Sequence, residues 1–205
     1  MQLYHHPFSA SARRVLLAAA HLGVALDLVE INLTSPDDRR RLEEMNANSK
    51  VPVLVDGDFV LWESCAIMQY LADGTPGQTV HPQDRAARAD VNRWMFWTCQ
   101  HFAPALGVFG WENVWKQAVT GEDADPRELA RGARDVAQVG AVLDKHLSTR
   151  RWLVGDAVTL ADYAMAAPLM YKEQARLPLD DYPHVLAWFA RVQELPAWQR
   201  TTPAW

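Results

Sequence analysis

The stretch KVPVLVDGDFVLWES, residues 50–64, contains two short apolar segments separated by Asp56-Gly57. An Asp-Gly pair between two such segments is a strong hairpin signal, so we expect two antiparallel strands. Pro52 opens the first strand, a position where a proline is tolerated although it donates no ladder hydrogen bond. Ser64 follows the second strand and is a good helix N-cap, so a helix is expected to begin there.

The start of this hairpin is also a candidate binding site. A cis peptide bond between Val51 and Pro52 would turn the backbone of Val51 outward. Its N–H and C=O groups could then pair with a peptide ligand, as an added strand does. At the other end of the hairpin, the first amides of the helix capped by Ser64 could hold a carboxylate. The segment therefore predicts a site for a small peptide.

The residues before this stretch alternate between strand and helix patterns. We expect a strand over Gln2 to His6, a helix over Ser9 to Leu22, a strand over residues 27–33 and a polar helix over Pro36 to about Met45. With the hairpin and the helix from Ser64, the order is β-α-β-α-β-β-α. This order predicts a layered α/β domain.

The remainder of the chain has only helical patterns. Residues 74–83 carry two prolines and two glycines and form the best candidate linker. Asp125-Pro126 predicts a helix start, residues 159–162 resemble a capping box, and a last helix is expected from about Pro183 to Glu194. We therefore predict an α/β domain over residues 1–74, a linker over 75–83 and an all-helical domain over 84–205.

Composition excludes several classes of function. The net charge is -5, and the only basic run, Arg39-Arg40-Arg41, lies among acidic residues, so no nucleic-acid partner is expected. No apolar stretch approaches the roughly 20 residues of a membrane span, and no secretory signal is found. Cys65 and Cys99 lack CxxC spacing, which favours reduced thiols in the cytoplasm. The histidines are dispersed and predict no metal site.

Over nearly its whole length the chain resembles the cytosolic glutathione S-transferase family. KVPVL at residues 50–54, followed by Glu63-Ser64, is similar to that family's glutathione site. LVGDAVTLAD at residues 153–162 is similar to the N-capping motif of its helical domain, and LYHHPFSASARRV at residues 3–15 looks like its serine-type, bacterial-like branches. The resemblance implies a thioredoxin-like domain followed by an all-α helical bundle.

The resemblance also implies a set of glutathione-binding residues. Val51, before Pro52, would pair its backbone with the cysteinyl part of glutathione. Glu63 would meet the ammonium of the γ-glutamyl end, while Ser64 and the helix amides would meet its carboxylate. Lys50 would face the glycyl carboxylate. The simpler alternatives are that Ser64 is only a cap and Lys50 only a surface lysine.

A serine is expected to activate the thiol of glutathione. Lowering a thiol pKa of about 8.5 by two units takes roughly 2.7 kcal/mol. A hydrogen bond from one hydroxyl to the thiolate supplies about 1.5–3 kcal/mol, and the first helix could add the rest. Ser9 matches the catalytic serine of the family, and Ser11 is its rival. Ala10 stands where many serine-type members have glycine.

Aromatic residues suggest where a second substrate would bind. Phe109, Trp111 and Trp115 follow Pro104 and lack a clean helical stripe, so they are candidates for lining an apolar electrophile pocket. Phe8, beside Ser9, is a further candidate. Packing in the core is an equally good explanation for these tryptophans.

Together these features predict a homodimeric, detoxifying glutathione transferase. Its glutathione thiolate would attack a small apolar electrophile, and the same thiolate could serve dehalogenation, isomerisation or peroxide reduction. Glutathione would be a co-substrate, with no metal. The alternative is a related binding or protein-interaction module without catalysis, which loss of the glutathione motif would favour. The motif is intact here.

Overall fold

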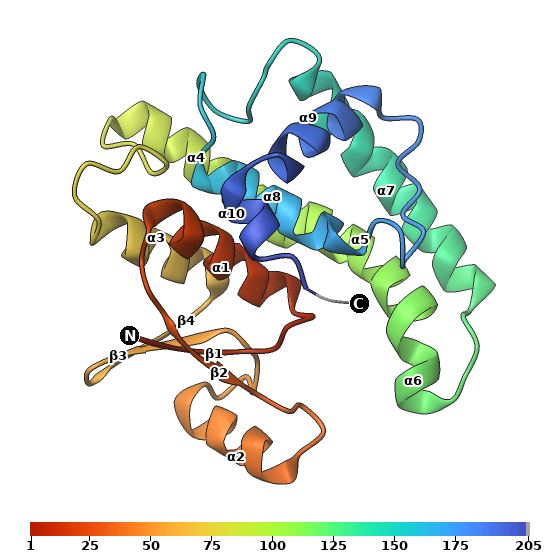
Figure 1. The fold of residues 1–205 in the computed structure, drawn as a ribbon. Helices are drawn as coiled ribbons and strands as arrows, with labels where there is room; N and C mark the ends of the chain where they lie inside the picture. Colours follow the sequence, from red (N-terminus) through yellow and green to blue (C-terminus); the bar gives the residue numbers. More distant parts are fainter. Residues whose placement is uncertain (204–205) are drawn as a thin grey trace. The chain divides into compact units, whose positions relative to one another are not determined.

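The computed structural model describes residues 1–203, and it divides into two compact units (Figure 1). Unit 1 comprises residues 1–81 and the C-terminal segment from residue 195, and unit 2 comprises residues 82–194. The C-terminal segment was expected in the helical domain. It belongs to unit 1 because its helix packs on the first helix of the chain. The last two residues of the predicted domain lie outside the described part.

Unit 1 is built on a four-stranded mixed sheet with the strand order β2-β1-β3-β4. Strand β1 runs parallel to β2 and antiparallel to β3, which pairs antiparallel with β4. The strands are β1 (Gln2–His5), β2 (Asp27–Glu30), β3 (Val53–Asp56) and β4 (Phe59–Trp62). The helices are α1 (Ala10–Leu22), α2 (Pro36–Met45), α3 (Ser64–Asp73) and α10 (Pro196–Arg200). The predicted order of elements is thus confirmed, and α10 is an addition to it.

Helices cover both faces of this sheet. Figure 1 shows α1 and α3 together on one face and α2 on the other. Tyr4 and Val53 form a buried cluster with Leu42 of α2. Their chain neighbours Leu3 and Leu54 are also fully buried, and they point to the opposite face because side chains alternate along a strand.

Two local predictions need correction. The strand predicted over residues 27–33 ends at Glu30, and the chain then turns at Asn32, whose side chain accepts a hydrogen bond from the Thr34 amide at 3.0 Å. Leu33 is therefore 41% exposed.

The hairpin turn consists of Gly57 and Asp58 rather than Asp56 and Gly57. Gly57 has φ 58°, the positive value that the first residue of a type II′ turn requires.

Unit 2 is helical throughout its regular structure. Its first helix is a continuous run of α4 (Arg85–Trp97), η1 (Thr98–Phe102), α5 (Ala103–Gly110), η2 (Trp111–Trp115) and α6 (Lys116–Thr120), in which η1 and η2 are π-helical turns. It is followed by α7 (Pro126–Leu147), α8 (Leu160–Ala166), the 3₁₀ turn η3 (Ala167–Tyr171) and α9 (Pro183–Gln193). Phe102, Tyr163 and Trp188 are fully buried in its core.

The predicted capping box at the start of α8 is confirmed. Asp162 accepts a hydrogen bond from the Thr159 amide at 2.9 Å, and its own amide donates to the Thr159 carbonyl at 3.1 Å. Within residues 1–203, no helix is both long enough and apolar enough to cross a membrane.

Candidate functional site

The pairing of the strands gathers the predicted site residues of unit 1 at one end of the sheet. Tyr4 lies opposite Val53, which in turn lies opposite Trp62. The carboxyl ends of β1 and β4 therefore meet the amino end of β3. The segments that leave or enter the sheet at this end carry Ser9, Val51-Pro52 and Glu63-Ser64.

Ser9 is the N-cap of α1. Its backbone is extended, with φ −85° and ψ 113°, and its Oγ accepts a hydrogen bond from the Ala12 amide at 3.1 Å. This bond uses a lone pair of the oxygen, so the hydroxyl proton remains available for donation. Within residues 1–203 no acceptor for that proton is recorded. Ser11 lies two residues further on, as the second residue of the helix.

The Val51-Pro52 peptide bond is cis, as expected. Pro52 is buried and Val51 is half-buried. In the described part of the chain, neither the N–H nor the C=O of Val51 has a recorded hydrogen-bond partner. Backbone groups that are buried away from water are nearly always paired. The N–H and C=O of Val51 could find such a pairing in a bound ligand.

Asn46 shapes the loop before Val51, although sequence reasoning did not select it. Its side-chain amide donates to the Lys50 carbonyl at 2.8 Å, and its Oδ1 accepts from the Asn48 amide at 3.0 Å. Asn46 is buried, and Lys50 itself is exposed. A buried asparagine at the end of α2 thus fixes where Lys50 and Val51 are presented.

Ser64 is not the N-cap that the sequence suggested. Helix α3 begins at Ser64 itself, and Glu63 holds the N-cap position without a side-chain hydrogen bond to the helix. Glu63 has φ 74°, a conformation that costs a residue with a side chain about 1–3 kcal/mol. Because the Glu63 side chain does not cap α3, the start of this helix is a candidate place for an anion.

The Ser64 hydroxyl is held by a residue of another helix. Nη1 of Arg14, in α1, donates to Ser64 Oγ at 3.3 Å, and both residues are buried. Sequence reasoning used Arg14 only to align the start of the chain. Nothing in the local pattern indicates a contact across 50 residues, so only the packing of α1 against α3 reveals it.

The residues predicted for the electrophile pocket differ in their surroundings. Within unit 2, Phe109 is only 6% exposed and contacts α7, where a Cβ at Gly132 would lie 3.0 Å from its ring. Trp111 is 41% exposed, and Trp115 packs edge-on against Tyr171 with ring centroids 6.3 Å apart. Phe8 is half-buried in unit 1, where its amide donates to the His6 ring.

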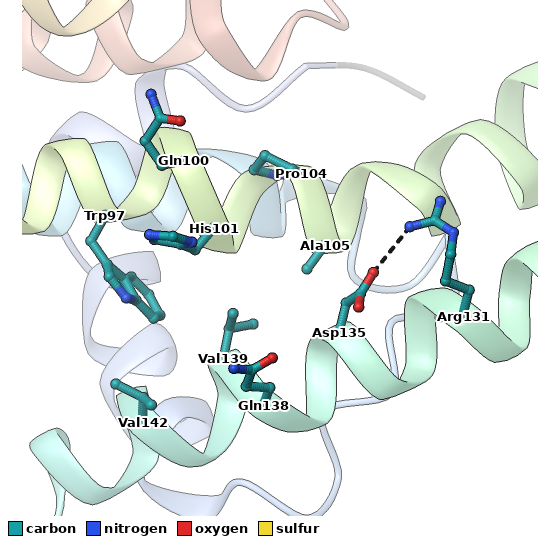
Figure 2. A pocket seen from close by; sticks show the side chains of 10 residues that line it. All are labelled: Trp97, Gln100, His101, Pro104, Ala105, Arg131, Asp135, Gln138, Val139 and Val142. Atoms are coloured by element: carbon teal, nitrogen blue, oxygen red, sulfur yellow. Dashed lines mark hydrogen bonds and ion pairs between the residues drawn. The ribbon is translucent and has the colours of Figure 1, made fainter.

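Unit 2 also has a hollow of about 380 Å³ between η1, the start of α5 and α7 (Figure 2). Trp97, Val139 and Val142 form its apolar part, and Figure 2 shows Arg131 joined to Asp135 at one end. None of the residues predicted for the electrophile pocket lines this hollow. Within the described residues, no group of three or more His, Cys, Asp or Glu side chains could hold a metal ion.

Comparison with known proteins defines the class. The model of the glutathione S-transferase N-terminal domain matches residues 1–73, and that of the C-terminal domain matches residues 112–196. Glutathione S-transferase 3 of Zea mays is 30% identical, over 100% of this chain and 94% of that protein. The chain belongs to the glutathione S-transferase family, and it is a glutathione transferase with a thioredoxin-like domain and a helical domain.

Among individual relatives, a glutathione S-transferase of Hyoscyamus muticus is 29% identical over 98% of this chain and 96% of its own. A solved structure of a theta class glutathione S-transferase from Xanthomonas axonopodis pv. citri, with glutathione bound, is 30% identical. It matches with a TM-score of 0.85 over 100% of this chain and 97% of that chain. These similarities do not favour a binding module without catalysis.

Proposed function

We propose that the enzyme binds glutathione at this end of the sheet in unit 1 and uses Ser9 to hold its sulfur as a thiolate, which attacks a small apolar electrophile. The observation that carries this proposal is the state of the Ser9 hydroxyl. Its oxygen caps α1, while its proton has no recorded acceptor within residues 1–203. A hydroxyl held in this way can donate to a sulfur placed at the start of the helix.

The energetics agree with this role. A thiol with a pKa of about 8.5 is only a few per cent ionised at pH 7, and lowering the pKa by two units takes roughly 2.7 kcal/mol. A hydrogen bond to a charged group contributes about 1.5–3 kcal/mol. The positive end of α1 adds about 0.3–1 kcal/mol. Serine is therefore not the nucleophile; it stabilises the thiolate that is.

The remaining contacts orient the tripeptide. The main chain of Val51 would pair with the cysteinyl residue, as its unpartnered N–H and C=O groups allow. The γ-glutamyl carboxylate would meet Ser64 and the start of α3, and Glu63 would meet the γ-glutamyl ammonium. Lys50, which is exposed, would face the glycyl carboxylate.

For the electrophile, Trp111 and Trp115 of unit 2 are the candidate apolar contacts, and Phe8 of unit 1 is a separate candidate. Phe109, also a candidate, is largely buried and contacts α7, so it is better explained by packing within unit 2. Membership of the family also supports a homodimer, a cytoplasmic location and a role in detoxification. Dehalogenation, isomerisation and peroxide reduction remain reactions of the same thiolate.

An ultraviolet titration of bound glutathione tests the mechanism, because the thiolate absorbs and the thiol does not. The wild-type protein should form thiolate well below the pKa of free glutathione. Ser9→Ala should retain binding but raise the pKa of the bound thiol by about one to two units, as loss of a hydrogen bond to a charge requires.

Ser11→Ala is the matched control, since it removes a hydroxyl from the same helix turn. Its titration should follow that of the wild type. If Ser11→Ala shifts the titration and Ser9→Ala does not, Ser11 is the activating residue. Binding with an unshifted thiol in the wild type would contradict thiolate activation altogether.

A further inference from the structure

Arg14 combines burial, charge and contact with the predicted carboxylate site in unit 1. It lies in the second turn of α1 and is only 5% exposed, and Ser64 is only 4% exposed. Nη1 of Arg14 donates to Ser64 Oγ at 3.3 Å. A guanidinium cannot accept a hydrogen bond, so the direction of this bond is certain.

The direction of this bond determines what Ser64 can do. A hydroxyl has one proton and two lone pairs, and Arg14 occupies a lone pair. The proton of Ser64 must therefore be donated elsewhere, and no acceptor for it is recorded within residues 1–203. Ser64 is also the first residue of α3, and the N-cap residue Glu63 makes no side-chain hydrogen bond to this helix. The Ser64 hydroxyl, at the start of α3, thus has a proton to donate, and the buried guanidinium of Arg14 lies within hydrogen-bond distance of its oxygen.

The neighbouring Arg13 shows that a buried arginine in α1 need not act in this way. Its Nη2 donates to the Thr202 hydroxyl at 3.1 Å, and its guanidinium carbon lies 3.7 Å from the centre of the Trp198 ring. Successive residues of a helix point about 100° apart, so the two arginines serve different surroundings. Arg13 attaches the C-terminal segment of unit 1, whereas Arg14 contacts the start of α3.

We propose that Arg14 is a positioning residue for the α-carboxylate at the γ-glutamyl end of glutathione. It orients the Ser64 hydroxyl so that its proton points to the carboxylate, and it supplies positive charge behind that hydroxyl. This inference rests on the proposed glutathione site. It assigns to Arg14 a selectivity for peptides that carry this carboxylate, and no part in ionising the thiol.

Calorimetric binding of two peptides tests the assignment. One is glutathione, and the other is 4-aminobutyryl-cysteinyl-glycine, which lacks only the γ-glutamyl α-carboxylate. Arg14→Met should weaken glutathione binding about tenfold or more, the effect of one hydrogen bond that involves a charge. Binding of the second peptide should change less than about twofold. Arg13→Met is the matched control: it removes an equally buried arginine and should leave the ratio of the two affinities unchanged.

Two further measurements keep the test decisive. Arg14→Lys keeps the charge but should weaken glutathione binding in the wild type, because the hydrogen bond to Ser64 is disturbed. In a Ser64→Ala background the same substitution should have a much smaller effect, because the hydroxyl that Arg14 orients is gone. The thiol of glutathione bound to Arg14→Lys should titrate as in the wild type. The role of Arg14 is overturned if Arg14→Met weakens the binding of both peptides equally. It is also overturned if the effects of the Arg14 and Ser64 substitutions on glutathione binding simply add. Either result leaves the transferase proposal intact. A wild-type protein that does not bind glutathione overturns both.

Discussion

Replacing Asp162 by asparagine is expected to lower the free energy of unfolding by about 1–3 kcal/mol, because the carboxylate is surrounded by donors. Asp162 is fully buried in unit 2. Its Oδ1 accepts from the Leu153 amide at 3.0 Å and from Trp188 Nε1 at 2.9 Å. Its Oδ2 accepts from the amide of Thr159 at 2.9 Å and from the hydroxyl of the same residue at 3.0 Å.

The magnitude follows from counting donors. The Leu153 amide and the Trp188 indole can only donate, so the oxygen of an asparagine must face them. Its NH₂ group then faces Thr159, whose hydroxyl can turn to accept, but whose amide is left buried and unpaired at a cost of about 1–3 kcal/mol. Burial raises the pKa of the Asp162 carboxyl above its ordinary value, although the four hydrogen bonds oppose this shift. Removing the buried charge therefore offsets part of the loss.

Alanine at the same position should cost more, at least about 4 kcal/mol, since three buried N–H groups lose their acceptor together. Urea unfolding followed by tryptophan fluorescence and far-ultraviolet circular dichroism measures both variants. The control is Asp144→Asn. Its carboxylate accepts from the amides of His184 at 2.8 Å and Val185 at 3.1 Å but is only half-buried, so water can replace it and the loss should stay below about 1 kcal/mol. If Asp162→Asn matches the wild type, or if the two asparagine variants lose equally, the reasoning from buried donors is wrong.

Two other effects on stability can be read with the same urea assay. Gly140→Ala should cost about 1–3 kcal/mol, because the new Cβ would lie 2.7 Å from the Tyr182 ring. The control, Gly107→Ala, places its Cβ in open space and should be neutral or stabilising by up to about 1 kcal/mol. Equal effects of the two substitutions would show that Tyr182 moves aside freely. Burial lowers the pKa of His146 below its ordinary 6.5, so the unfolded chain binds the proton more readily and stability should fall as pH drops through this value. His146→Gln should reduce the difference in stability between about pH 7.5 and about pH 5.5, and an unchanged difference would exclude His146 as a source.

The order of elements in unit 1 could be predicted because each signal is local. A turn pair, an N-cap or an alternating strand is contained within a few residues, as in the hairpin at residues 53–62 and the capping box before α8. The start of α3 was misplaced by one residue for the same reason. A serine favours the N-cap by itself, but the positive φ of Glu63 depends on the surrounding structure.

Contacts between distant residues could not be predicted in this way. The C-terminal segment belongs to unit 1 through Arg13 and Trp198, which are 185 residues apart. Arg14 meets Ser64 across 50 residues, and no periodicity in α1 distinguishes it from Arg13. Arginine side chains are rarely buried fully in globular proteins, yet both of these are buried in the structure.

The N-termini of α1 and α3, at the same end of the sheet, differ in a way that suits their proposed roles. Ser9 caps α1 and retains its proton, so the helix needs no ligand to satisfy its Ala12 amide. The N-cap residue of α3, Glu63, makes no side-chain hydrogen bond to the helix and has a strained φ of 74°. Such a backbone conformation costs about 1–3 kcal/mol of strain, which stability alone would not favour. The strained start of α3 is therefore consistent with the proposal that an anion binds there, while the start of α1 is capped by Ser9 itself, whose hydroxyl proton is the one proposed to meet the sulfur.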